Sequence, residues 1–176
     1  STRGALLKKL IVFVVLVVGG VWFYGRSLPR EHRVSASVTL VAPVDTVWGV
    51  VRHIGSSHLW WSDVKAVRRL DLRKESYEQN MGASGMVSVE ITSEEPPRRL
   101  VTTILNISQT KVGGTWTYEV RLTESGTEVT ITENGWIESP FSRVMAKVTG
   151  VHRTLVSYLS SLGAHFGETV TPRQRG

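Results

Sequence analysis

The sequence has 176 residues, 41% of them hydrophobic, and a net charge of +6, which leaves room for one ordinary domain and an appendage. It contains no cysteine, so disulfides, thiolate metal sites and cysteine nucleophiles are excluded. Six basic residues and one acid precede Val34, whereas residues 34–172 carry 13 basic and 14 acidic residues. Because the part expected to fold is nearly neutral, we predict no nucleic-acid binding, and basic ends are typical of membrane-flanking segments.

An apolar segment near the N-terminus, residues 10–24, carries no charge. Together with the few apolar residues before it, this segment approaches the roughly 20 residues that a bilayer core requires. Trp22 and Tyr24 stand at its end, and aromatic side chains favour the membrane interface. We therefore predict a single-pass transmembrane anchor over residues 1–25, in contact with the membrane through residues 5–25.

The alternative for this segment is a cleaved signal peptide. Such a peptide requires small residues at a cleavage site after the apolar run, and the bulky sequence WFYGRSLPR stands there instead.

Three basic residues precede the span and three follow it, so their count does not set the orientation. Since a short basic N-terminus usually stays in the cytoplasm, we expect a cell-membrane protein with its domain on the extracytoplasmic side.

The segments after the span indicate one domain. Residues 26–32 form the expected linker, residues 33–168 the domain, and residues 169–176 a basic tail. In RVSASVTL, which begins at Arg33, apolar and polar residues alternate, as is typical of a half-buried strand. The following sequence VDTVWGVVRHI predicts a short helix, and SSHLWW predicts a second one.

Strand patterns dominate the chain from Val64 to Ile137. Turn residues such as Pro96-Pro97 and Ser125-Gly126 separate five or six apolar, alternating segments. With the first strand they give an antiparallel sheet of six to seven strands. Runs of strands followed by a helix predict an α+β domain with that helix on one sheet face.

The closing stretch, residues 139–166, is strongly amphipathic. Ser139 suits a helix N-cap and Pro140 the first helical position. At 100° per residue its apolar side chains fall on a single stripe, which predicts one helix of about seven turns. The residues of this stripe are Phe141, Val144, Met145, Val148, Leu155, Leu159, Leu162 and Phe166.

Two local patterns resemble the helix-grip fold of the START-like, or SRPBCC, superfamily, which includes polyketide cyclase/dehydrase-type proteins. The first is VSASVTLVAPVDTVWGVV, followed about ten residues later by Trp60-Trp61-Ser62-Asp63-Val64. The second is the strand EVTITENGWI leading into a long helix that bears Tyr158-Leu159. The resemblance covers residues 33–167 and implies a curved sheet wrapped on the C-terminal helix, with a hydrophobic ligand cavity between them.

A cavity of this kind would be lined by inward-facing side chains of the strands and the closing helix. The expected lining residues are Trp61, Val89, Ile91, Leu105, Trp116, Tyr118, Val120, Ile131, Met145, Val148, His152 and Leu155. Aromatic residues among them either stack on a ligand or belong to an ordinary core. Trp136 has the parity opposite to Ile131, so we place it on the other sheet face unless the strand bulges.

Two polar residues are candidates for catalysis. His152 falls near the middle of the apolar stripe, where it either faces the cavity as an acid/base or is a satisfied core histidine. Glu133 shares the parity of Ile131, so it either meets His152 across the cavity or lies at the sheet edge in solvent. A cavity pair of this type would have shifted pKa values.

No motif indicates a cofactor or a metal. His53, His58 and Asp63 lie close in sequence but at no recognised ligand spacing, and HExxH, GxSxG, Walker A and dinucleotide patterns are lacking. We predict no cofactor and no metal site.

Three functions fit these observations. The leading hypothesis is a membrane-anchored protein that binds a hydrophobic small molecule or lipid without catalysis. The second is a cyclase- or aromatase-like enzyme that uses Glu133 and His152. The third is an interaction module whose cavity is filled by its own side chains, and it predicts no ligand-sized cavity.

Overall fold

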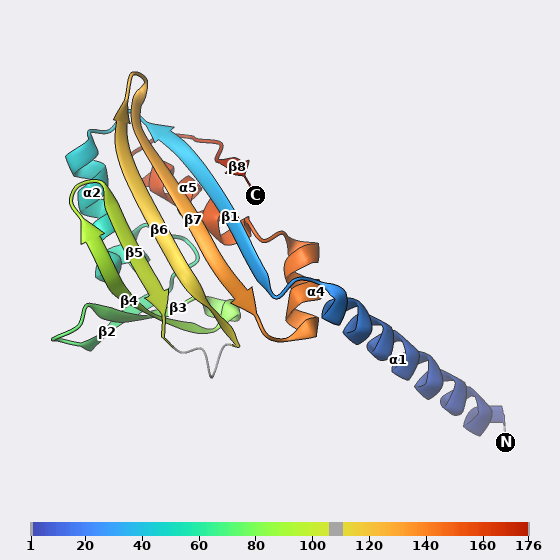
Figure 1. Ribbon diagram of the computed structural model, residues 1–176. Helices are drawn as coiled ribbons and strands as arrows, with labels where there is room; N and C mark the ends of the chain where they lie inside the picture. Colours follow the sequence, from blue (N-terminus) through green and yellow to red (C-terminus); the bar gives the residue numbers. More distant parts are fainter. Residues whose placement is uncertain (1, 106–110, 176) are drawn as a thin grey trace.

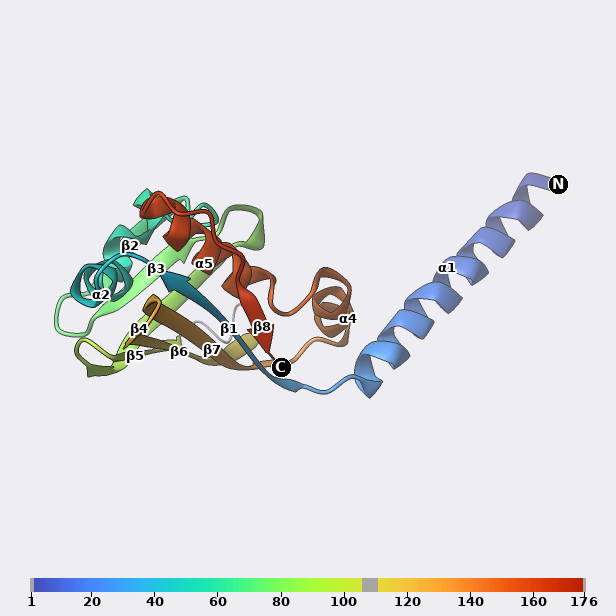
Figure 2. The same ribbon diagram turned by 90° about the horizontal axis from the view of Figure 1, so that it is seen from above.

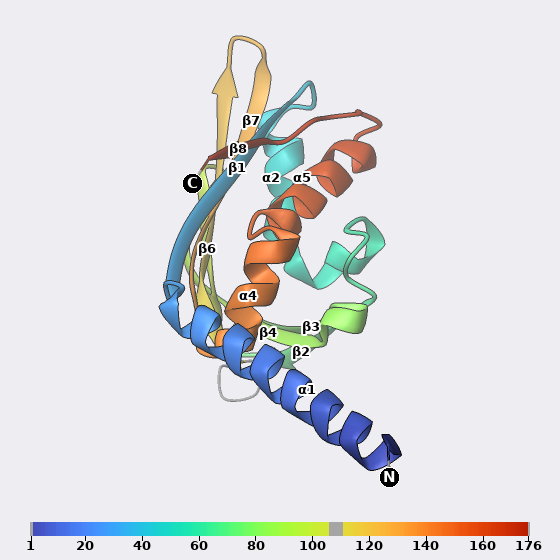
Figure 3. The same cartoon turned by 90° about the vertical axis from the view of Figure 1, so that its right-hand side faces the viewer.

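The structure, a computed structural model, describes residues 2–105 and 111–175. Its domain is framed by one antiparallel sheet with the strand order β2-β3-β4-β5-β6-β7-β1-β8, shown in Figure 1. The strands are β1 (Glu31–Leu40), β2 (Ala66–Asp71), β3 (Ser76–Asn80), β4 (Met86–Glu95), β5 (Arg99–Ile104), β6 (Val112–Thr123), β7 (Gly126–Ile137) and β8 (Arg173–Arg175). The sheet curves strongly, and helices cover only its concave face (Figures 2 and 3). The α+β helix-grip expectation is confirmed.

The alternation in the first strand places one of its faces in the core. Val34, Ala36, Val38 and Leu40 are all buried, as the pattern predicts. β1 pairs along its whole length with β7, so the first strand of the domain adjoins its last long strand. The sequence tail adds one more strand, because β8 pairs with residues 35–37 of β1.

Three short helices lie early in the domain. The helix α2 (Val44–Arg52) buries Val47, Trp48 and Val51, and the 3-10 helix η1 (Ile54–Leu59) follows it. A further 3-10 turn, η2 (Gly82–Ser84), joins β3 to β4. Together with the closing helical segment, α2 and η1 cover the concave side of the sheet (Figure 3).

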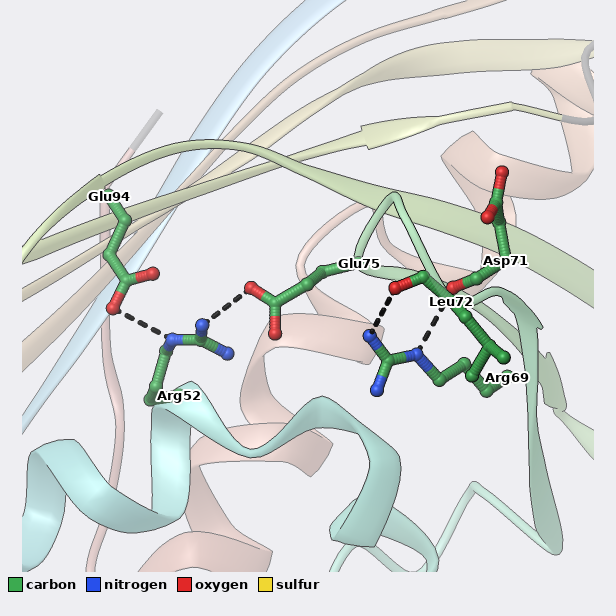
Figure 4. Close-up of polar contacts among 6 residues, drawn as sticks. All are labelled: Arg52, Arg69, Asp71, Leu72, Glu75 and Glu94. Atoms are coloured by element: carbon green, nitrogen blue, oxygen red, sulfur yellow. Dashed lines mark hydrogen bonds and ion pairs between the residues drawn. The ribbon is translucent and has the colours of Figure 1, made fainter.

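An ion-pair cluster fastens the end of α2 to the sheet. Arg52 donates to Glu94 on β4 at 2.7 Å and to Glu75 before β3 at 2.5 Å, as Figure 4 shows. Burial lowers the pKa of the Arg52 guanidinium, but the hydrogen bonds with the two carboxylates outweigh it and raise this pKa above its usual value. Beside it, Arg69 donates to the backbone carbonyls of Asp71 and Leu72, which shapes the β2–β3 turn.

The closing stretch is two helices and not one, so the expected continuous helix is wrong. The helix α4 (Pro140–Thr149) begins at the predicted N-cap, where Ser139 Oγ accepts from Ser142 N at 3.3 Å. It ends at Gly150, whose φ of 87° cannot continue a right-handed helix. The helix α5 (Arg153–His165) then starts anew and buries Leu155, Leu159 and Leu162 on the sheet.

The N-terminal helix α1 (Thr2–Ser27) projects away from the domain (Figure 1). Its most apolar 18-residue window, within Arg3–Ser27, has a mean hydropathy of 2.3, and no residue of that window is buried. At 1.5 Å per residue the helix is about 38 Å long, enough for a hydrocarbon core of about 30 Å. By length and composition, α1 is therefore able to span a membrane.

Candidate ligand-binding site

A cavity of about 160 Å³ lies between the concave face of the sheet, η1 and α5. An apolar engineered cavity of about 150 Å³ is known to hold benzene, whereas pockets for drug-sized ligands measure roughly 300–1,000 Å³. The cavity is thus neither filled by its own side chains nor large, and it accommodates about one aromatic ring.

Aromatic side chains form one wall of this cavity. The rings of Trp61 and Tyr158 meet edge to face with centroids 4.9 Å apart, and Tyr118 lies 5.5 Å from Tyr158. Trp116 bridges the group, 5.9 Å from Trp61 and 6.0 Å from Tyr118. Aliphatic residues, among them Val89, complete the apolar lining.

A few polar groups interrupt this apolar surface. The amide of Gln79 donates to Ser57 Oγ at 3.0 Å, and the hydroxyl of Tyr118 is hydrogen-bonded to Thr102. Burial raises the pKa of Tyr118 far above its usual value, the hydrogen bond to Thr102 lowers it, and the charge of Glu133 raises it again. Burial likewise raises the pKa of Tyr158, so both phenols stay neutral at physiological pH.

The indole N–H of Trp61 has no hydrogen-bond partner among the described residues, although Trp61 is only 4% exposed. A buried donor that is left unpaired costs about 1–3 kcal/mol. Trp61 lines the cavity, but its indole nitrogen is itself shielded from water-sized space, so an acceptor atom of a bound molecule removes this cost only if neighbouring side chains shift. An unused donor thus lies in the wall of a mostly apolar pocket.

Glu133 lines another wall of the cavity. It faces Trp116 directly across the β6–β7 ladder, and its Oε2 accepts from Trp116 Nε1 at 2.9 Å. Its other oxygen lies 2.8 Å from Nε2 of His32, which comes from β1. A Cβ at Gly135 would lie 2.8 Å from the His32 ring, so glycine leaves the room that this pair needs.

The structure brings together only some of the expected site residues. Trp61, Val89, Trp116, Tyr118 and Glu133 line the cavity. Val120, Ile131 and Leu155 are fully buried in the close-packed core instead, and Ile91 packs partly buried against it. Leu105 follows the end of β5 and is exposed.

The remaining expected lining residues lie away from the cavity because the closing stretch breaks at Gly150. Met145 and Val148, on α4, are exposed. His152 does not meet Glu133, since its Nε2 lies 3.1 Å from the carbonyl oxygen of Arg175 in β8. The partner of Glu133 is His32, which sequence analysis assigned to the linker, and the cross-strand register alone reveals the pair.

Other lining residues were also missed by sequence analysis. Tyr158 was identified only as part of a family pattern, although its spacing of three from Leu155 places it on the buried side of α5.

Trp136 lies with its ring against Gly113, and β7 pairs with β6 without a bulge, so the opposite parity of Trp136 is confirmed. Within the described residues, no group of three or more His, Asp or Glu side chains is placed to hold a metal ion.

A family model described as polyketide cyclase / dehydrase and lipid transport matches residues 31–166, from β1 to the end of α5. The chain belongs to this family. As a member of the polyketide cyclase/dehydrase family it has the ligand-binding helix-grip fold, and its cavity occupies the space between sheet and helix. No curated protein sequence matches the chain.

Solved structures share this fold at low sequence identity. The Zhui aromatase/cyclase from a Streptomyces species has a TM-score of 0.66 at 15% identity, covering 77% of this chain and 93% of its own. An uncharacterised protein from Bacillus thuringiensis gives 0.62 at 13%, covering 78% and 100%. The di-domain ARO/CYC protein StfQ of the steffimycin biosynthetic pathway has a TM-score of 0.62 at 9% identity. The match covers 76% of this chain and 50% of StfQ. These likenesses show the fold alone.

Proposed function

We propose that this protein is anchored in a membrane by α1 and binds a small hydrophobic molecule that carries one hydrogen-bond acceptor. The buried Trp61 N–H, which has no partner among the described residues, lies in the wall of a mostly apolar, aromatic cavity and supports this proposal most directly. Once the side chains around this N–H shift, a carbonyl or ether oxygen would accept from it, and a flat apolar body would pack on Trp116 and Tyr158. A single ring fits the cavity as it stands, and a larger ligand or a lipid chain requires it to widen.

The test compares two probes of similar size, acetophenone and isopropylbenzene, of which only acetophenone has an acceptor. In Trp61→Phe we expect the affinity for acetophenone to fall about two- to tenfold relative to isopropylbenzene, since one hydrogen bond contributes about 0.5–1.5 kcal/mol. Ligand-observed NMR or calorimetry on the full chain in detergent measures both dissociation constants.

Trp136→Phe is the matched control, because Trp136 lies on the outer sheet face against Gly113. It should leave the ratio of the two affinities unchanged. An equal loss of both probes in Trp61→Phe, or no loss of either, would contradict a ligand acceptor at Trp61.

A second candidate function is general acid–base catalysis. The observation that favours it is Glu133, whose carboxylate lines the cavity and has His32 at 2.8 Å behind it. In this account Glu133 takes a proton from a carbon next to a ligand carbonyl, and His32 positions the carboxylate.

A further inference from the structure

The helix α4 exposes an apolar face that no described part of the chain covers. Phe141, Met145 and Val148 are spaced as i, i+4 and i+7, so they lie on one side of the helix. Their exposures are 42%, 59% and 75%. Because α4 diverges from α5 at Gly150, this face does not continue the buried stripe of Leu155 and Leu159.

The opposite side of α4 is fastened to the last turn of α1. Arg143 Nη1 donates to the carbonyls of Gly25 and Leu28, each at 3.2 Å, and its other nitrogens donate to the carbonyls of Ile137 and Glu138. Gly25 is buried against Pro140, where a Cβ would overlap the carbonyl. Figures 1 and 3 show α4 lying beside this end of α1.

These contacts fix the level of α4 along the axis of α1. The ammonium of Lys147 lies 5.9 Å from the Tyr24 ring, and the Arg26 guanidinium lies 4.8 Å over Trp22. Trp, Tyr and Arg at the end of an apolar helix are the side chains that membrane interfaces favour. When α1 spans a bilayer, α4 therefore lies at the depth of the headgroups and the first acyl carbons.

We propose that α4 is an interfacial membrane helix whose face of Phe141, Met145 and Val148 is covered by the lipid of the leaflet in which α1 ends. The inference rests on the membrane anchorage of the proposed function and adds a second, surface contact to it. Lys147 and the exposed Arg153 lie nearby as partners for anionic headgroups. Thr154, which lines the cavity, follows only a few residues after α4, so this contact holds that end of the cavity close to the bilayer.

The absence of native cysteine allows an unambiguous test on the full chain. Single variants Met145→Cys and Val148→Cys are labelled with an environment-sensitive NBD dye and reconstituted in vesicles of phosphatidylcholine and phosphatidylglycerol. Leu122→Cys is the matched control, because Leu122 is also 75% exposed but lies in the β6–β7 hairpin, remote from α1 (Figure 1). The dye on a fourth variant, Val15→Cys, reports whether α1 itself lies in the bilayer.

We expect lipids with shallow doxyl groups to quench the dye at 145 and 148 several times more than at 122, and aqueous iodide to show the reverse order. If the dye at 148 behaves like that at 122 while the dye at 15 is quenched by lipid, this inference is overturned and the anchorage stands. If the dye at 15 is not quenched by lipid either, both fail. Shielding of 145 and 148 from both quenchers would show that protein covers the face, which also overturns the inference.

Discussion

At the residue scale, Trp61 and Glu133 give one small cavity two distinct polar functions. The buried N–H of Trp61 has no partner among the described residues, so an oxygen atom brought next to it would be a favourable acceptor. Glu133 offers a carboxylate that Trp116 and His32 hold in place, which suits proton transfer. The two neutral phenols of Tyr118 and Tyr158 add no charge to this surface, and Glu133 is the only acidic or basic side chain among the described lining residues.

Catalysis by Glu133 predicts exchange of carbon-bound protons. In D₂O, the Glu133 carboxylate would remove a methyl proton of bound acetophenone, and the resulting enolate would regain a deuteron from the exchanged carboxyl group. General bases contribute about 10²- to 10⁴-fold, so exchange should be accelerated over buffer and lost in Glu133→Gln. Proton NMR of the methyl signal measures the rate.

Glu128→Gln is the control for this change, because Glu128 lies on the same strand but pairs with Arg121 on the other sheet face. It should leave the exchange rate intact. Exchange no faster than in buffer would remove the catalytic candidate and leave the binding function in place.

At the scale of the elements, the break between α4 and α5 decides which residues reach the cavity. The periodicity of apolar residues passes through Gly150 without a shift, so the sequence alone predicts one helix. A positive φ at residue 150 turns α4 out of line and exposes Met145 and Val148. The backbone conformation of a single glycine thus has a larger effect on this site than the pattern of the side chains around it.

Replacing Gly150 tests this conformation. No atom of the described residues lies within 4 Å of a Cβ built on Gly150, so Gly150→Ala introduces backbone strain and no clash. We expect a loss of about 1–3 kcal/mol in the free energy of unfolding, because the backbone angles of Gly150, φ 87° and ψ 123°, lie in a region that L-residues rarely adopt. Chemical denaturation followed by circular dichroism measures it.

Gly49→Ala in α2 is the matched control, since that position is helical and equally free of contacts. Alanine there should stabilise the protein by about 0.5–1 kcal/mol. A stabilising effect of Gly150→Ala as well would mean that the two closing helices are continuous in solution.

Elements with a clear period were predictable from the sequence, and contacts that depend on tertiary placement were not. The alternation of Val34, Ala36, Val38 and Leu40 identified β1 and its buried face, and the parity of Glu133 placed its side chain toward the cavity. By contrast, the pairing of Glu133 with His32 depends on the β1–β7 register, over 101 residues of chain. The unpaired state of the Trp61 N–H follows only from the packing of its neighbours.

At the scale of the molecule, a series of contacts connects α1 through α4 and α5 to the cavity. Arg143 joins α1 to α4, α4 leads directly into α5, and α5 closes the cavity with Thr154 and Tyr158. Hydrophobic molecules concentrate in bilayers, so an anchored domain meets such ligands where they are most abundant. If α1 anchors the protein as proposed, this arrangement favours binding at the membrane over transport through solution.

Native mass spectrometry of the full chain, with organic extraction, tests the central claim most directly. We predict a reproducible adduct of a small, oxygen-containing hydrophobic molecule on the natural chain, and its loss in Val89→Phe, which fills the cavity from β4. The thermal midpoint of the variant shows whether it folds. The account is contradicted if the natural chain carries no adduct under gentle conditions, or if folded Val89→Phe retains the same adduct.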